Sequence, residues 1–205
     1  MSPAFVLRSS FVAASLALSA LAAQATTVIP VTQDGSWNAF TVDALSTSAE
    51  HALDWIDVDH VPAAGNASPL SFTFTVTDHA ILRVVDLFAA GDTFNVSITS
   101  AASTQWLSTT AVAAHDLSDA VIPFADTASQ AWANAADFSQ LQVTLGAGTY
   151  TVTGSLLQSV TDGGFALNST GGALSVTAVP EPATLSLALA AFGVVGLMVR
   201  RRSQA

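Results

Sequence analysis

An acidic segment at residues 50–60 carries the densest group of side chains that could bind a metal ion. It holds three aspartates, Asp54, Asp57 and Asp59, between two histidines. Hard carboxylate oxygens suit Ca²⁺, whereas histidine nitrogens suit Zn²⁺. If residues 53–58 form a strand, Asp57 and Asp59 share one face and Asp54 lies on the other. The spacing matches neither an EF-hand loop nor a His-Glu-x-x-His helix. The three aspartates are therefore candidate Ca²⁺ ligands, but a solvated acidic face is the interpretation that we favour, and we expect no obligatory cofactor.

A second acidic pair, Asp86 and Asp92, flanks an expected turn at residues 88–91. Aspartate near a turn commonly accepts hydrogen bonds from the backbone amides of that turn. We expect this structural role for Asp92, with Ca²⁺ binding by the pair as the alternative.

No set of residues marks the chain as an enzyme. A glycosidase needs two carboxylates about 5–10 Å apart across a cleft, and fifteen acidic residues make chance pairs unavoidable. The sequence has no Gly-x-Ser-x-Gly nucleophile elbow. We expect a non-enzymatic protein, and an unrecognised hydrolase remains a further alternative.

The four tryptophans, Trp37, Trp55, Trp106 and Trp132, offer a different chemistry. Indole rings stack on sugar rings, as aromatic platforms do in carbohydrate-binding sandwiches. Large aromatic side chains more often fill a hydrophobic core. We favour the core, and a carbohydrate-binding module that uses these tryptophans is the alternative.

The elements that position these side chains are predicted to be strands. Apolar residues alternate with Ser, Thr, Gln or Asn at residues 71–77, 93–99, 140–145 and 149–153. Such period-two alternation is typical of strands with one face on a core and one face in water. The Gly146-Ala147-Gly148 segment predicts a hairpin between the last two runs. Weaker strand patterns cover residues 28–32, 37–42, 53–58, 81–88 and 174–178.

The fold class predicted from these runs is all-β. Short strands separated by turn signals favour an antiparallel β-sandwich or jelly-roll-like domain. An alanine-rich stretch at residues 128–138 predicts one short helix. A signal helix at the N-terminus and a transmembrane helix at the C-terminus complete the expectation.

The charge balance excludes one large class of partners. The chain has 15 acidic and 5 basic residues among 205, with 51% hydrophobic and 10% charged residues. Nucleic-acid affinity depends on Lys and Arg that neutralise phosphates, so we expect no nucleic-acid partner. The chain has no cysteine, which rules out disulfides and thiol catalysis.

The first 25 residues read as a secretory signal peptide. Arg8 precedes an apolar run at residues 11–23, and Ala23-Gln24-Ala25 is an Ala-x-Ala cleavage site. We expect cleavage before Thr26, with the Sec translocon and signal peptidase as partners. A membrane anchor is the alternative, although the run is shorter than the about 20 residues that a span needs.

The last 26 residues form a second sorting segment. Val179-Pro180-Glu181-Pro182 is followed by an apolar run at residues 185–199 and by Arg200, Arg201 and Arg202. Arginines directly after a transmembrane run stay in the cytoplasm, which places the preceding domain outside the inner membrane. The two prolines leave the backbone extended where a peptidase reaches it.

This order of features resembles the PEP-CTERM sorting signal of Gram-negative bacteria. The resemblance implies that an exosortase, a membrane-embedded processing enzyme, cuts near Pro180-Glu181-Pro182 and releases or relocates the protein. It also implies an association with exopolysaccharide and biofilm production. An ordinary tail-anchored protein is the alternative.

A narrower resemblance lies within the central region. Phe124, Asp126 and Ala128 form a Phe-x-Asp-x-Ala box, which is similar to the FxDxA subfamily of PEP-CTERM proteins. This resemblance implies no catalytic residue. From the residues themselves, Asp126 is expected to cap the short helix that follows it.

The central region, residues 26–179, is expected to be one β-rich exported domain between segments 1–25 and 180–205. It carries 14 acidic residues against Arg83, so its formal charge is −13. Such a charge opposes contact with anionic lipids or acidic polysaccharides unless divalent cations bridge them. We expect a periplasmic domain that is transiently anchored to the inner membrane and then reaches the cell surface or the medium.

Overall fold

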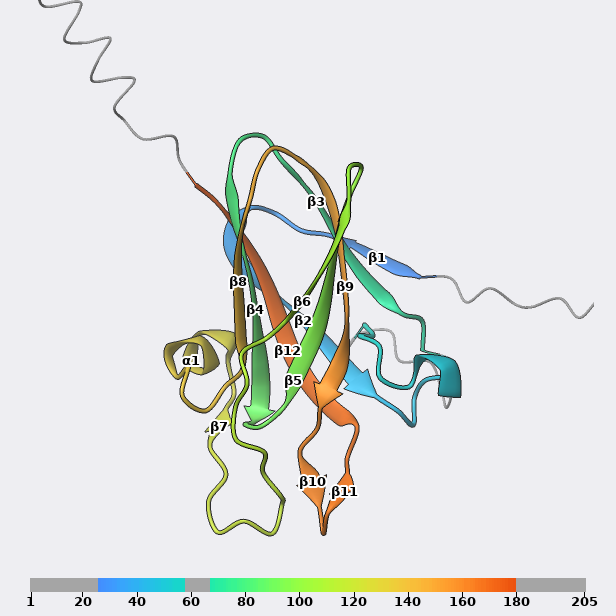
Figure 1. Ribbon diagram of the computed structural model, residues 1–205, viewed down its shortest axis with the longest axis vertical. Coiled ribbons are helices and arrows are strands. Elements are labelled where there is room, and N and C mark those ends of the chain that lie inside the picture. Colours follow the sequence, from blue (N-terminus) through green and yellow to red (C-terminus); the bar gives the residue numbers. More distant parts are fainter. Residues whose placement is uncertain (1–25, 58–66, 180–205) are drawn as a thin grey trace, which may run out of the picture.

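The described chain folds into two facing β-sheets with one short α-helix. The computed structural model describes residues 26–57 and 67–179 (Figure 1). Its elements are β1 (Thr27–Pro30), β2 (Asp34–Asp43), the 3₁₀ helix η1 (Ala49–His51), β3 (Leu70–Val76), β4 (Ala80–Ala89), β5 (Thr93–Ser100), β6 (Thr104–Ser108), β7 (Phe124–Ala125), α1 (Ala128–Ala133), β8 (Gln140–Leu145), β9 (Gly148–Gln158), β10 (Thr161–Asp162), β11 (Phe165–Ala166) and β12 (Ser169–Ala178).

The first sheet has the strand order β1-β3-β9-β5-β6, and in the second sheet β12 lies between β2 and β4. Strands β7 and β8 both pair with β4, and β10 pairs with β11 as a separate small hairpin. All pairs are antiparallel except β1 with β3. The prediction of a mainly β, sandwich-like domain with antiparallel sheets is confirmed. The expected signal and transmembrane helices lie outside the described residues.

The period-two runs form strands as predicted, with their apolar side chains between the two sheets. Phe72 and Phe74 of β3 and Phe94 of β5 are buried, whereas intervening Thr side chains on β3 are more exposed. At the centre, the rings of Phe40 and Trp55 stack with centroids 3.8 Å apart, and Phe94 meets Phe40 edge-on at 5.2 Å. Burying each such side chain contributes about 1.5–3 kcal/mol.

The predicted hairpin at Gly146-Ala147-Gly148 is wrong. Strand β8 pairs with β4 of the second sheet, whereas β9 pairs with β3 and β5 of the first. The glycines therefore carry the chain from one sheet to the other. A glycine-rich segment signals only that the chain turns, and each strand then takes whichever sheet covers its apolar face.

The described part of the predicted strand at residues 53–58, residues 53–57, does not form a continuous strand. Asp54 and Ile56 make only isolated bridges, to Ser155 of β9 and to both Thr41 and Pro69. This short segment thus spans from β2 of the second sheet to β9 of the first. Its hydrophobic residue Trp55 enters the core at the crossing.

The short helix is present but ends earlier than predicted, at Ala133 instead of residue 138. Asn134 leaves the helical conformation, and its side chain donates a hydrogen bond to Asp137 Oδ2 at 2.8 Å. Helix α1 packs on the outer face of the second sheet, beside β4 and β8 in Figure 1, through a small cluster that includes Val85, Ala131 and Phe138. Among the described residues, no helix is long and apolar enough to cross a membrane.

Candidate functional site

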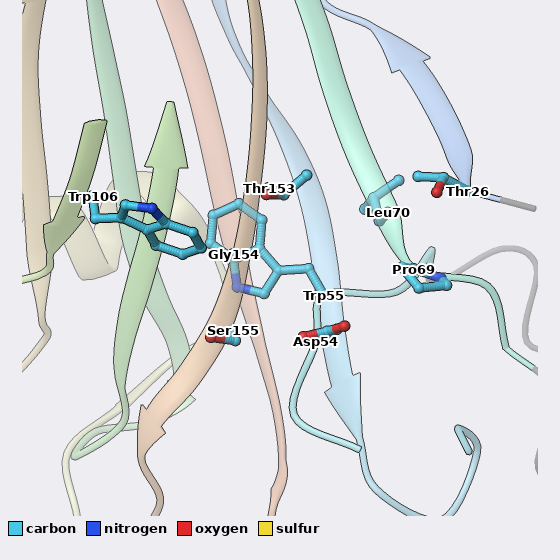
Figure 2. A pocket seen from close by; sticks show the side chains of 9 residues that line it. All are labelled: Thr26, Asp54, Trp55, Pro69, Leu70, Trp106, Thr153, Gly154 and Ser155. Carbon is cyan, nitrogen blue, oxygen red and sulfur yellow. The ribbon is translucent and has the colours of Figure 1, made fainter. Parts of the chain in front are cut away.

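A pocket with a mixed polar and apolar lining opens at the first sheet, where the crossing segment meets β9 (Figure 2). Its volume is about 260 Å³. The described residues that line it are Thr26, Asp54, Trp55, Pro69, Leu70, Trp106, Thr153, Gly154 and Ser155. Hydroxyl groups, one carboxylate and two indole rings therefore surround one small space.

Trp106 forms one side of the pocket from the edge strand β6. Trp106 is 69% exposed, although tryptophan has the largest side chain of the amino acids in the chain. It pairs across the sheet with Ser97, and Ser97 pairs with Thr153. These three residues share one face, so the indole stands beside hydroxyl groups instead of the core. The sequence Thr104-Gln105-Trp106-Leu107-Ser108 signals this arrangement, because alternation places Trp106 on the same face as Thr104 and Ser108.

Trp55 lies at the inner side of the pocket and is fully buried. Its backbone N–H donates to the carbonyl of Gly154 at 2.9 Å. A Cβ atom at Gly154 would overlap indole atoms Cε2 and Cζ2, so this position admits only glycine while the ring stays in place. The indole Nε1–H, which is attached to Cε2, has no hydrogen-bond acceptor among the described residues. A buried donor without an acceptor costs about 1–3 kcal/mol.

Asp54 supplies the one carboxylate among the described residues that line the pocket. Its side chain is 37% exposed, and its Oδ2 lies 2.7 Å from His51 Nδ1 in η1. The backbone at Asp54 bridges Ser155 of β9. The His51 contact orients the carboxylate, and the bridge places Asp54 opposite Ser155; Figure 2 shows both side chains on the same side of the Trp55 ring.

The predicted metal ligands are not seen together. Asp54 lines the pocket, Asp57 is buried at 8% exposure, and Asp59 lies outside the described residues. No group of three metal-binding side chains occurs within residues 26–57 and 67–179. The Ca²⁺ hypothesis for this segment remains a prediction.

Asp86 and Asp92 are both buried, at 0% and 2% exposure, at one end of the sandwich. Burial, together with the neighbouring charge of Asp92, raises the pKa of Asp86 to about 9. Burial also raises the pKa of Asp92. Asp86 is therefore a neutral carboxylic acid at pH 7. Its Oδ2 accepts a hydrogen bond from the Asp92 backbone N–H at 3.3 Å, whereas its Oδ1 has no partner among the described residues.

The expected turn role of Asp92 needs correction. Its Oδ1 accepts a hydrogen bond at 2.7 Å from the backbone N–H of Val160, which lies 68 residues further along the chain. Asp92 thus ties the β4–β5 connection to the segment after β9. It also lines a second cavity of about 240 Å³, together with Phe88 and Thr170.

The expected capping role of Asp126 is wrong, because the neighbouring Thr127 caps α1. Thr127 Oγ1 accepts a hydrogen bond from the Gln130 N–H at 3.3 Å, and Gln130 Oε1 accepts one from the Thr127 N–H at 3.2 Å. This reciprocal pair is a capping box. In the Phe-x-Asp-x-Ala box, Phe124 is 63% exposed, Asp126 is exposed, and Ala128 is buried against the sheet.

The tryptophans divide between the two predicted roles. Trp55 belongs to the core, as we favoured. Trp37 and Trp132 are partly buried and lie 5.8 Å apart on the outer face of the second sheet, where the Arg83 guanidinium lies 5.2 Å from the Trp132 ring centroid. Trp106 is the exposed one of the four. For Trp106 the platform interpretation stays a prediction.

Comparison with known proteins gives one family match. The model of the PEP-CTERM protein-sorting motif matches residues 178–202. The chain carries a PEP-CTERM sorting motif. This motif implies an exported, extracellular protein that exosortase sorts and that a C-terminal membrane anchor holds before processing. It supports the expected PEP-CTERM assignment and exosortase as a partner.

No curated protein matches the chain. Among solved structures, the chain is similar to the pre-peptidase C-terminal domain of collagenase from Bacillus anthracis, with 8% identity and a TM-score of 0.34. That likeness covers 75% of this chain and 96% of the other. It is too weak to indicate a shared function.

Proposed function

We propose that this PEP-CTERM protein is a non-enzymatic component of the cell surface or extracellular matrix of a Gram-negative bacterium. In this proposal, the Sec translocon and signal peptidase export it, and it belongs to the FxDxA subfamily. It works in association with exopolysaccharide and biofilm production. Its acidic, Ser- and Thr-rich sandwich suits a hydrated matrix, since a large net charge opposes self-association.

The observation that carries this proposal is the position of the sorting motif. The matched residues begin at Ala178, the last residue of β12. The Ala178 and Val179 N–H groups still donate to Gln33 and His79 carbonyls, at 3.1 and 2.9 Å. Cleavage within Pro180-Glu181-Pro182 would therefore free the sandwich without removing any residue of its strands.

Replacing Pro180, Glu181 and Pro182 together by alanine tests the sorting step. In a host with its exosortase, the variant is expected to accumulate as a longer, membrane-retained species, because the peptidase loses its recognition triplet. Replacing Ser203 and Gln204 by alanine is the matched control, which should be processed as the wild type is. Unchanged mass and secretion of the triplet variant would contradict processing at this motif.

The absence of enzymatic activity is part of the proposal. A glycosidase uses a pair of carboxylates, whereas Asp54 stands alone among the described residues that line the main pocket. We therefore expect no new reducing ends when the full-length protein is incubated with exopolysaccharide from its host. Release of reducing ends that stops in an Asp54→Asn variant would establish a hydrolase instead.

We further propose that the protein needs no cofactor. The buried pair Asp86 and Asp92 already uses carboxylate oxygens to bind backbone N–H groups. Calorimetric titration of the full-length chain with CaCl₂ or ZnCl₂ should show no binding. Ca²⁺ binding that is lost in Asp57→Asn or Asp59→Asn would restore the metal site predicted from the sequence.

A carbohydrate-binding module is the second candidate. The observation that favours it is the exposed Trp106 ring at the edge of a hydroxyl-lined pocket. Retention of the protein by immobilised host exopolysaccharide would support this candidate. Failure to bind any exopolysaccharide fraction would leave the structural role alone.

A further inference from the structure

We propose that the pocket beside Trp106 binds one neutral pyranose residue of a polysaccharide. This inference rests on the second candidate function above and assigns its site and its class of ligand. The pocket combines an exposed aromatic ring, a carboxylate held by His51, and hydroxyl groups.

The platform is Trp106. A pyranose ring presents a face of C–H groups, which packs against an indole, and a rim of hydroxyl groups, which needs polar partners. Trp106 is 69% exposed on β6, the last strand of the first sheet, so no neighbouring strand covers it. Trp37 and Trp132 are less suitable, because their rings pack on each other and Arg83 lies over the Trp132 ring.

The polar partners lie on the other sides of the same pocket. The Asp54 carboxylate accepts hydrogen bonds from neighbouring sugar hydroxyls, and its contact with His51 holds it in one orientation at no further cost on binding. The Thr153 and Ser155 hydroxyls both donate and accept. Figure 2 shows Trp106 at one end of the pocket, with Asp54 and Ser155 along one side.

Trp55 closes the inner side of the pocket. Its residue is fully buried, it lines the pocket, and its Nε1–H has no acceptor within residues 26–57 and 67–179. Because this nitrogen has almost no accessible surface, a sugar in the pocket does not contact it. The polar contacts of the ligand therefore come from Asp54, Thr153 and Ser155.

Charge and size select the class of sugar. The region of residues 26–179 has a formal charge of −13, and none of the described lining residues is basic. Uronic acids and sulfated sugars would meet the Asp54 carboxylate without a compensating cation, so a neutral hexose fits better. The volume of about 260 Å³ is slightly below the about 300–1,000 Å³ of ordinary small-molecule pockets, which suits a single residue of a longer chain.

The test uses the full-length chain in a polyoxyethylene detergent, because detergents with sugar head groups would compete. Neutral gluco-, galacto- and manno-oligosaccharides are titrated by calorimetry, with uronic-acid oligomers in parallel. We expect at least one neutral series to bind and to shift the tryptophan emission to shorter wavelength, because the ligand covers Trp106. The uronic-acid oligomers should bind at least about tenfold more weakly, which is about 1.4 kcal/mol.

Two variants locate the site. Trp106→Ala and Asp54→Asn should each weaken neutral-sugar binding at least about tenfold, since interfaces depend most on such aromatic anchors and charge-assisted hydrogen bonds. Both residues are partly exposed, so both variants should fold. Phe165→Ala is the matched control, because Phe165 is 80% exposed in the β10–β11 hairpin and does not line the pocket.

The remaining outcomes overturn the inference in distinguishable ways. Unchanged binding by Trp106→Ala would show that the protein binds sugar elsewhere, which leaves the carbohydrate-binding function standing. Preference for uronic acids would refute the neutral ligand. If the protein bound no oligosaccharide and no host exopolysaccharide, both the site and the second candidate function would be refuted. The sorting experiment tests a separate proposal, and its outcome would not depend on this result.

Discussion

An Asp86→Asn substitution is expected to stabilise the protein at neutral pH and to reduce the pH dependence of its stability. Asp86 is fully buried between the sheets, and burial together with the charge of Asp92 raises its pKa from 3.8 to about 9. The folded protein therefore keeps a proton on Asp86 that the unfolded chain releases above about pH 4. Asparagine has nearly the same shape and carries no charge in either state.

The magnitude follows from the difference between the two pKa values. Folding raises the pKa of the Asp86 carboxyl group. Its contribution to stability is fully present below the pKa that the group has in the unfolded state. This contribution is lost as the pH rises towards the pKa that the group has in the folded state. The free energy of unfolding should therefore fall by about 1.4 kcal/mol per pH unit between about pH 4 and pH 9. At pH 7 the proton on Asp86 costs about 4 kcal/mol. The side-chain amide introduced by Asp86→Asn would leave one buried donor without an acceptor at about 1–3 kcal/mol, so a net gain of about 1–3 kcal/mol is expected.

Urea unfolding of the full-length chain at pH 5, 6, 7 and 8 measures both effects. The free energy of unfolding of the wild type should fall across this pH range. That of Asp86→Asn should change less with pH and should be higher than the wild-type value at pH 7 and 8. Some slope should remain, because burial also raises the pKa of Asp92. Asp126→Asn is the matched control, since Asp126 is exposed and should change neither curve.

Equal slopes in wild type and Asp86→Asn would refute the reasoning, because they would show that Asp86 is ionised in the folded state. The partly exposed carboxylate Asp116 acts in the opposite direction and below this pH range. Hydrogen bonds from the Ser118 and Thr161 side chains lower its pKa, so its contribution is present above about pH 4 and is lost as the pH falls. Measurements from pH 5 upwards therefore separate the two groups.

Two further substitutions test the packing and the helix cap. Gly154→Ala should lower the free energy of unfolding by about 1–3 kcal/mol, because the new methyl group overlaps the Trp55 indole, whereas Gly146→Ala, with open space around it, should be neutral in the same urea titration. Thr127→Ala should cost about 1 kcal/mol through loss of the α1 cap, and Asp126→Ala should cost almost nothing. An unstable Asp126→Ala with a stable Thr127→Ala would reverse the assignment of the cap.

The features that depend on local sequence were predictable. Alternating runs such as residues 71–77 identify strands and their buried faces, because side chains on a strand point alternately to its two sides. The sorting motif at residues 178–202 is likewise a continuous pattern, and its family match follows from residue order alone. Helix α1 begins at Ala128 as predicted. It ends earlier than predicted, because Asn134 and Asp137 form a local turn there.

The candidate site was predicted only in pieces. The tryptophans and the acidic segment were recognised separately, but nothing local brings Asp54 into one pocket with Trp106, which lies 52 positions further along the chain. Thr153, Gly154 and Ser155 of β9 were not recognised, because their functional position depends on the pairing of β9 with β5 and with the crossing segment.

The sequence by itself determined the charge, the sorting segment and the faces of the main strands, since these depend on composition and on the two-residue period of a strand. Only the tertiary structure decided which sheet each strand joins, because pairing follows from how both sheets close one core. Gly146 and Gly148 therefore connect two sheets instead of one hairpin. The same closure buries Asp86 and gives it a raised pKa, and it leaves Trp106 on an edge strand where it lines one pocket with Asp54.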